Sequence, residues 1–188
     1  MSDRLKDCET LLAQARLLVS REELAEIYDR LAAEISERLA GRNPVILCVM
    51  IGGSVPAVEI IQRLKFAFEF DYLHATRYRG ETAGSELIWK VSPGTPLKDR
   101  DVLVIDDILD EGPTLKAILE ALKAQGPASV LSAVLVEKQH DRRDPNLKTD
   151  FVGVKLGDHY LFGAGMDYRG YLRQHPGIYA VPDDHKPG

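Results

Sequence analysis

An uninterrupted apolar run, Val102 to Ile105, is followed at once by acidic residues. Such a run is typical of a strand buried on both faces of a mostly parallel sheet. Asp106, Asp107 and Asp110 then fall within five positions. Crowded carboxylates repel one another, so the arrangement favours a bound metal ion or sugar hydroxyl groups that relieve the repulsion. The stretch therefore predicts a binding site at the carboxyl end of a central strand.

The residues that follow suit a phosphate. Gly112 permits a sharp turn or a close approach of the backbone, and Thr114 lies where a new helix is predicted to begin. The free N–H groups of a helix N-terminus bind phosphate well, so a phosphorylated sugar would satisfy both halves of the segment. A plainer interpretation remains open, in which Asp-Glu-Gly-Pro is a polar turn and Thr114 an ordinary helix cap.

The segment from Val102 to Thr114 resembles the PRPP-binding motif (PRPP, 5-phosphoribosyl-1-pyrophosphate) of the type I phosphoribosyltransferases, and hypoxanthine-guanine phosphoribosyltransferases in particular. The resemblance implies that Asp106 and Asp107 hold the ribose hydroxyls, directly or through Mg²⁺. It makes Asp110 both a member of the PRPP site and the candidate base for the purine N7 proton. It assigns the 5′-phosphate to Glu111, Gly112, Pro113 and Thr114. Glu111 departs from the threonine common in the family, and Pro113 removes one N–H group.

A second apolar run, from Val45 to Ile51, leads into a glycine pair and a predicted helix from about Pro56 to Leu64. A Gly-Gly turn at a strand end is most often only a turn. By resemblance, however, Ile51, Gly52 and Gly53 form the loop whose backbone amides meet the pyrophosphate of PRPP. Many relatives carry a lysine at the position of Ile51, so stabilisation here must come from the backbone.

The predicted strand from Val130 to Val136 delivers Lys138 to the sheet edge where open α/β proteins bind ligands. A lysine after a strand is usually solvated, and a lone tyrosine such as Tyr160 is usually part of the core. The resemblance implies that Lys138 donates to the 6-oxo group of the purine and that Tyr160 stacks on it. It also places three further residues at the site: Leu161 at the base edge through its backbone, Asp167 beside the base and the second Mg²⁺, and Arg173 at the pyrophosphate.

Two further predicted strands, from Phe68 to Thr76 and from Leu87 to Val91, flank a polar stretch punctuated by glycine. Such a stretch is either a slack loop or a lid. In the family, a long mobile loop at this place closes over the reacting centre, and the resemblance implies that Arg77 and Tyr78 occupy the place of its usual Ser-Tyr pair.

Strands alternate with helices along the chain, which predicts a Rossmann-like α/β domain with a mainly parallel sheet. We expect a single domain over residues 1–188, with N-terminal helices over about 1–41 and a base-binding hood over about 150–188. Ser20 and Glu23 form a capping box before an amphipathic pattern that ends at Gly41. Neither a GxGxxG nor a GxxxxGK[ST] motif is present.

The net charge of −5 provides no general attraction to nucleic acid or to an anionic membrane. The chain has no apolar stretch long enough to span a bilayer and no signal-peptide core at its start, so we expect a cytoplasmic protein. Its two cysteines, Cys8 and Cys48, indicate neither a disulfide framework nor a zinc site.

The resemblance implies a magnesium-dependent enzyme that acts on PRPP with hypoxanthine or guanine and forms IMP or GMP and pyrophosphate. Members of the family are commonly homodimers or homotetramers. Two alternatives stay open: a relative that prefers xanthine or adenine, and a non-catalytic regulator on the same scaffold that binds RNA and senses nucleotides.

Overall fold

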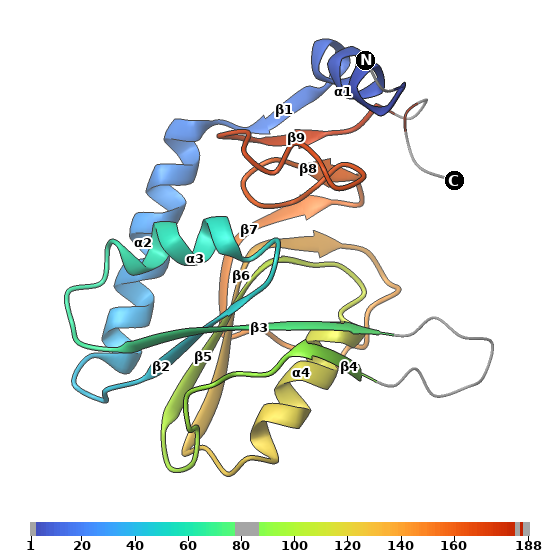
Figure 1. Ribbon diagram of the computed structural model, residues 1–188. Helices are drawn as coiled ribbons and strands as arrows, with labels where there is room; N and C mark the ends of the chain where they lie inside the picture. Colours follow the sequence, from blue (N-terminus) through green and yellow to red (C-terminus); the bar gives the residue numbers. More distant parts are fainter. Residues whose placement is uncertain (1–2, 78–86, 183–184, 186–188) are drawn as a thin grey trace.

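A six-stranded sheet forms the centre of the molecule (Figure 1). The computed structural model describes residues 3–77, 87–182 and 185. The strand order is β4-β3-β2-β5-β6-β7, and all neighbours pair in parallel except β3 and β4, which are antiparallel. The predicted α/β class with a mainly parallel sheet is therefore confirmed. The strands are β2 (Val45–Val49), β3 (Glu69–Arg77), β4 (Leu87–Val91), β5 (Asp101–Leu109), β6 (Ser129–Gln139) and β7 (Phe151–Gly157).

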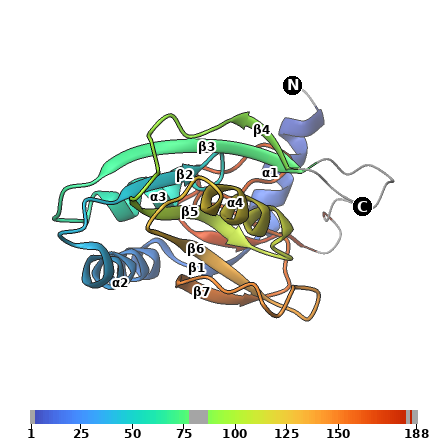
Figure 2. The same cartoon turned by 90° about the horizontal axis from the view of Figure 1, so that it is seen from below.

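Helices cover both faces of this sheet. α2 (Arg21–Leu39) and α3 (Ser54–Ile61) pack on one face, and α4 (Pro113–Lys123) lies on the other, as Figure 2 shows. Alternate residues of β5 point into the two cores, because side chains alternate along a strand: Leu103 faces α2 and α3, whereas Val104 faces α4. The four residues from Val102 to Ile105 are completely buried, as their apolar run predicts.

β5 continues past the point where the sequence predicts its end. The expected strand stops at Ile105, but β5 pairs with β6 as far as Leu109, opposite Glu137. β6 likewise extends to Gln139, so Lys138 lies within the strand. Pairing with a neighbouring strand satisfies the backbone hydrogen-bonding groups of these polar residues. The local pattern of apolar residues does not reveal this pairing. The acidic pair is therefore held by a sheet and not by a loop.

A second, antiparallel sheet forms a hood above the main one, in the order β1-β9-β8. It joins β1 (Arg16–Val19), β9 (Ile178–Ala180) and β8 (Leu161–Phe162), and α1 (Asp3–Gln14) packs against it through Cys8 and Leu11. The sequence predicts only helices before residue 41, so β1 is an additional element. β7, expected in the hood, instead pairs with β6 in the main sheet.

The predicted capping box of α2 is confirmed. The Glu23 N–H donates to the Ser20 hydroxyl oxygen at 3.2 Å, and the Ser20 N–H donates to the Glu23 carboxylate at 2.7 Å. These two bonds satisfy N–H groups that a helix start leaves free. Among the described residues, no helix combines the length and apolar character needed to cross a bilayer.

Candidate active site

The acidic pair on β5 is partly buried and crowded. Burial raises the pKa of Asp106 well above its ordinary value, and the neighbouring Asp107 carboxylate raises it further. Burial also raises the pKa of Asp107. In the described part of the chain no salt bridge reaches either carboxylate, and the site cations Lys138 and Arg173 pair elsewhere. Two adjacent carboxylates without a salt-bridge partner provide the hard oxygen ligands that a divalent ion prefers.

The glycine loop after β2 lies directly against this pair. A Cβ atom on Gly52 would lie 1.8 Å from Oδ2 of Asp107, and one on Gly53 would lie 2.7 Å from the carbonyl oxygen of Ile105. Only glycine permits so close an approach. The Met50–Ile51 peptide bond is cis, and the Ile51 side chain is half exposed. The structure therefore brings together two segments that the sequence assigns to PRPP.

The hood reaches the same place through Gly165, at which a Cβ atom would lie 2.2 Å from the carbonyl oxygen of Gly52. Arg173 donates from Nη1 to the Gly165 carbonyl oxygen at 2.7 Å, and its Nη2 pairs with Oδ1 of Asp167 at 2.6 Å. The other oxygen of Asp167 accepts the Gly170 N–H at 2.6 Å. Both oxygens of Asp167 thus have protein partners, and its role towards a metal stays a prediction.

The turn between β5 and α4 ends with Gly112, which caps the helix in a left-handed conformation (φ +84°). α4 starts at Pro113, so Thr114 is its second residue and not its cap, contrary to the plainer interpretation of this segment. Proline is well suited to the first helical position, where its missing N–H has no intrahelical partner. A cavity of about 280 Å³ lies along this turn, lined by residues from Asp106 to Leu115. The guanidinium of Arg142 lies 3.4 Å from Glu111 and offsets its charge.

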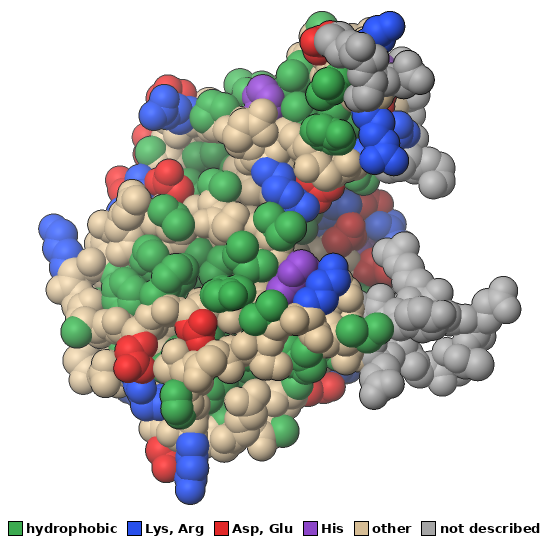
Figure 3. Space-filling view, in the orientation of Figure 1, with side chains coloured by type: hydrophobic (Ala, Val, Ile, Leu, Met, Phe, Trp, Pro, Cys, Tyr) green, Lys and Arg blue, Asp and Glu red, His purple; other side chains and the backbone are tan. Residues whose placement is uncertain are grey.

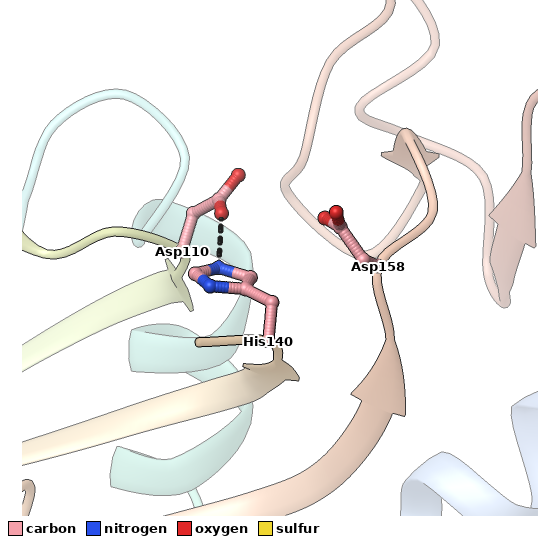
Figure 4. Close-up of side chains that lie close together, drawn as sticks. All are labelled: Asp110, His140 and Asp158. Atoms are coloured by element: carbon pink, nitrogen blue, oxygen red, sulfur yellow. Dashed lines mark hydrogen bonds and ion pairs between the residues drawn. The ribbon is translucent and has the colours of Figure 1, made fainter. Parts of the chain in front are cut away.

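Asp110 lies beyond the acidic pair, and each of its carboxylate oxygens has a hydrogen-bond partner in the described residues. The ammonium of Lys138 lies 2.6 Å from Oδ2. Nε2 of His140 lies 2.8 Å from Oδ1, the contact that Figure 4 shows. Burial alone would raise the pKa of Asp110, but the hydrogen bonds and charges of Lys138 and His140 hold it below its ordinary value. Asp110 is therefore a carboxylate of fixed orientation.

Asp158 faces this group from the turn after β7. Arg142 binds both of its oxygens, at 2.7 Å and 3.0 Å, and this pair lowers the pKa of Asp158 to about 2. Asp110, His140 and Asp158 have ligand atoms within 4.8 Å of one another, the donor set of a metal site. Lys138 and Arg142 already supply positive charge there, so we interpret the cluster as an ion-pair network.

Comparison with known proteins decides the family. The model of the phosphoribosyl transferase domain matches residues 18–169. The chain belongs to this family. A hypoxanthine-guanine phosphoribosyltransferase of Staphylococcus epidermidis is 32% identical over 164 residues, which is 86% of this chain and 90% of that protein. A hypoxanthine-guanine-xanthine phosphoribosyltransferase of Tritrichomonas foetus is 29% identical over 163 residues, covering 87% and 89%.

Solved structures agree with the predicted phosphoribosyltransferase fold. A hypoxanthine phosphoribosyltransferase from Staphylococcus aureus superposes with a TM-score of 0.86 at 27% identity, covering 92% of this chain and 94% of that one. The family predicted from the Val102–Thr114 segment is thus confirmed.

Other predicted site residues of this phosphoribosyltransferase lie in or near the hood. The Tyr160 ring is partly buried and meets the Tyr168 ring edge-on at 6.1 Å. Burial, then the charge of Asp167, raises the pKa of Tyr160. Leu161 is buried in β8 opposite Ala180. Arg77 is the last residue of β3, whereas Tyr78 and the rest of the predicted lid lie outside the described residues.

Proposed function

We propose that this protein transfers the 5-phosphoribosyl group of PRPP to hypoxanthine or guanine, forming IMP or GMP and pyrophosphate. The observation that carries the proposal is the order of groups along β5. The Asp106–Asp107 pair meets the glycine loop, and Asp110 meets Lys138 a few residues further on. The proposed site for the sugar phosphate thus lies next to the proposed site for a base with a 6-oxo group. The names of the relatives support the same reaction.

The chain's own groups would act on PRPP as follows. Asp106 and Asp107 accept hydrogen bonds from the ribose hydroxyls. The backbone N–H groups of the glycine loop bind the pyrophosphate, and those of the first turn of α4 bind the 5′-phosphate. When the bond from ribose C1 to pyrophosphate breaks, positive charge grows on the sugar and negative charge on the leaving group. The acidic pair stabilises the first charge, and the amides with Arg173 stabilise the second.

We propose Mg²⁺ as the cofactor. Asp106 and Asp107 fit such an ion because they are adjacent, partly buried and in no salt bridge of the described residues. When bound, the ion supplies positive charge that neutralises the pyrophosphate as it leaves. Asp167 is the proposed carboxylate for a second Mg²⁺, and it would have to share an oxygen now bound by Arg173 or Gly170.

Lys138 and Asp110 would recognise the purine together. An ammonium group carries only hydrogen-bond donors, so Lys138 is able to bind the 6-oxo group. Asp110 would accept the N7 proton, because binding of the 6-oxo group draws Lys138 away from its carboxylate. Tyr160 would stack on the base, and the backbone of Leu161 would contact its edge.

Base choice tests this assignment. An ammonium group donates but cannot accept from the 6-amino group of adenine, so hypoxanthine and guanine should be substrates and adenine should not. Lys138→Ala should raise KM for both 6-oxopurines and reduce the ratio of their kcat/KM to that of adenine. Tyr160→Ala should weaken all bases alike, because stacking does not depend on the 6-substituent. Steady-state kinetics with each base measures these changes.

Lys116→Ala is a matched control, because Lys116 also pairs with an aspartate, at 2.7 Å, but outside the predicted base site. It should leave base choice unchanged. If Lys138→Ala has the same KM and kcat as the parent with both 6-oxopurines, this lysine does not recognise the 6-substituent of the base. Xanthine belongs in the same panel, because the relative from Tritrichomonas foetus carries xanthine in its name. RNA binding by a protein inactive with every base would favour the regulator instead.

We also propose that the protein forms a homodimer or homotetramer through the outer part of the sheet. Phe70 and Tyr72 on β3 and Ile88 on β4 are each more than two-fifths exposed. Phe70 lies opposite Ile46, which belongs to the core under α2 and α3, so Phe70 and Tyr72 lie on that face of the sheet. Figure 3 shows apolar side chains gathered over α3 and β3. An apolar patch of this kind marks an interaction surface.

Tyr72→Glu should therefore lower the molecular mass measured by sedimentation. A buried charge at an interface is costly unless it is paired. Leu17→Glu on β1, where the side chain is half exposed on the hood, is the control that should keep the parent mass. A parent protein that sediments as a monomer at micromolar concentration would refute the interface.

A further inference from the structure

His140 lies next to Asp110, the proposed general base, and its side chain is buried. It follows the last residue of β6, and only 4% of its side chain is exposed. Positions 138 and 140 alternate along an extended segment, so their side chains share one side of it. β6 lies beside β5, with Leu109 opposite Glu137, so that both side chains reach Asp110. The two residues take different oxygens of that carboxylate.

The hydrogen bond of the second ring nitrogen indicates the tautomer of His140. Nδ1 lies 3.2 Å from the backbone N–H of Arg142, which can only donate. Nδ1 therefore accepts, and the proton of a neutral imidazole resides on Nε2, which faces Asp110. The hydrogen-bond pattern thus makes His140 a neutral donor to Asp110, locked in place by its own backbone partner. No positive charge on the ring is needed for this contact.

The two hydrogen-bond partners of Asp110 have different roles when substrate binds. In the proposed reaction Lys138 also binds the 6-oxo group of the purine. His140 binds no part of the substrate, and its side chain is buried. The other charged groups that face Asp110 are Arg142, at 3.8 Å and about half exposed, and Asp158, a like charge. His140 is thus the buried contact that persists when Lys138 leaves.

We propose that His140 is a positioning residue, which holds Oδ1 of Asp110 so that Oδ2 is aimed at the purine N7 proton when Lys138 moves to the 6-oxo group. The inference rests on the proposed function of Asp110 and adds a residue that the PRPP motif does not contain. Its physical basis is that small errors in the placement of a base slow proton transfer strongly.

Three substitutions separate positioning from a merely structural role. His140→Phe keeps an aromatic ring but removes the donor. His140→Gln places an amide N–H near the position of Nε2, whereas His140→Asn is too short to reach Asp110. His185→Phe is the matched control, because Nδ1 of His185 lies 3.4 Å from Asp7 near the N-terminus, away from the site. Each variant is assayed for kcat, for KM of PRPP and of hypoxanthine, and for the pH profile of kcat/KM.

We expect His140→Phe to lower kcat by about 10-fold or more, as for the loss of a hydrogen bond to a charged group, with KM for PRPP unchanged. Loss of the donor raises the pKa of Asp110, so the acidic limb of the profile should move to higher pH. His140→Gln should retain more of the parent kcat than His140→Asn, and His185→Phe should match the parent. If the Phe variant does not fold, the comparison of Gln with Asn decides.

Equal kcat and equal pH profiles in the parent, Asn and Gln variants would overturn the inference while leaving the proposed function intact. A parent protein that forms no nucleotide from PRPP and any purine would instead overturn the proposed function and the inference with it.

Discussion

Asp110→Asn is expected to lower kcat by about 10²–10⁴-fold, the range for loss of a general base, while PRPP still binds. The amide keeps the size of the carboxylate but cannot take the N7 proton. Lys138 and His140, which now hold the two oxygens of Asp110, would retain one acceptor between them. The loss should therefore be catalytic and not a loss of fold.

Turnover with hypoxanthine and calorimetric binding of PRPP measure the two effects separately. Asp144→Asn is the matched control, because Asp144 also lies 2.7 Å from a lysine, Lys116, but has no proposed role in the reaction. Turnover in Asp110→Asn close to that of the parent would remove Asp110 from the mechanism, and loss of PRPP binding would assign it to the sugar phosphate instead.

Removal of divalent metal is expected to abolish the reaction, and Mg²⁺ should restore it. The reason is the Asp106–Asp107 pair, because burial disfavours the charged form of both residues and the charge of Asp107 further disfavours that of Asp106. A pyrophosphate leaving group adds further negative charge at the same place, so the site without a dication would repel its own substrate. The assay is nucleotide formation in excess EDTA, followed by addition of Mg²⁺.

Asp167→Ala refines this prediction. It should weaken the Mg²⁺ dependence of pyrophosphate binding more than the Mg²⁺ dependence of sugar phosphate binding. The reason is that Asp167 lies with Arg173 on the hood side of the site. Full activity of the parent in excess EDTA would exclude the proposed metal requirement.

Local signals in the sequence were sufficient for the core of the fold and for the sugar phosphate half of the site. A strand buried on both faces shows itself as an apolar run, so β2 and β5 were predictable. The glycine pair and the acidic pair each follow such a run, and parallel strands bring these ends to one edge. Gly52 against Asp107 is the direct result.

Contacts between distant residues were not predictable in this way. β1 is stabilised by pairing with β9, in which Arg16 lies opposite Ala180, and a four-residue strand has no distinctive pattern of its own. Asp158 and Arg142 lie at the site only because the segments that follow β7 and β6 come together in space. His140 carried one usable signal, its alternation with Lys138 at the end of a strand, but nothing in the sequence reveals that the ring is buried.

The most direct test of the proposed function is to incubate the protein with PRPP and Mg²⁺ and each of hypoxanthine, guanine, xanthine and adenine, and to quantify nucleotide and pyrophosphate together. We expect IMP and GMP to form, each with an equal amount of pyrophosphate, and adenine to remain unchanged. Adenine consumed as fast as hypoxanthine, or no nucleotide from any of the four bases, would contradict the assignment.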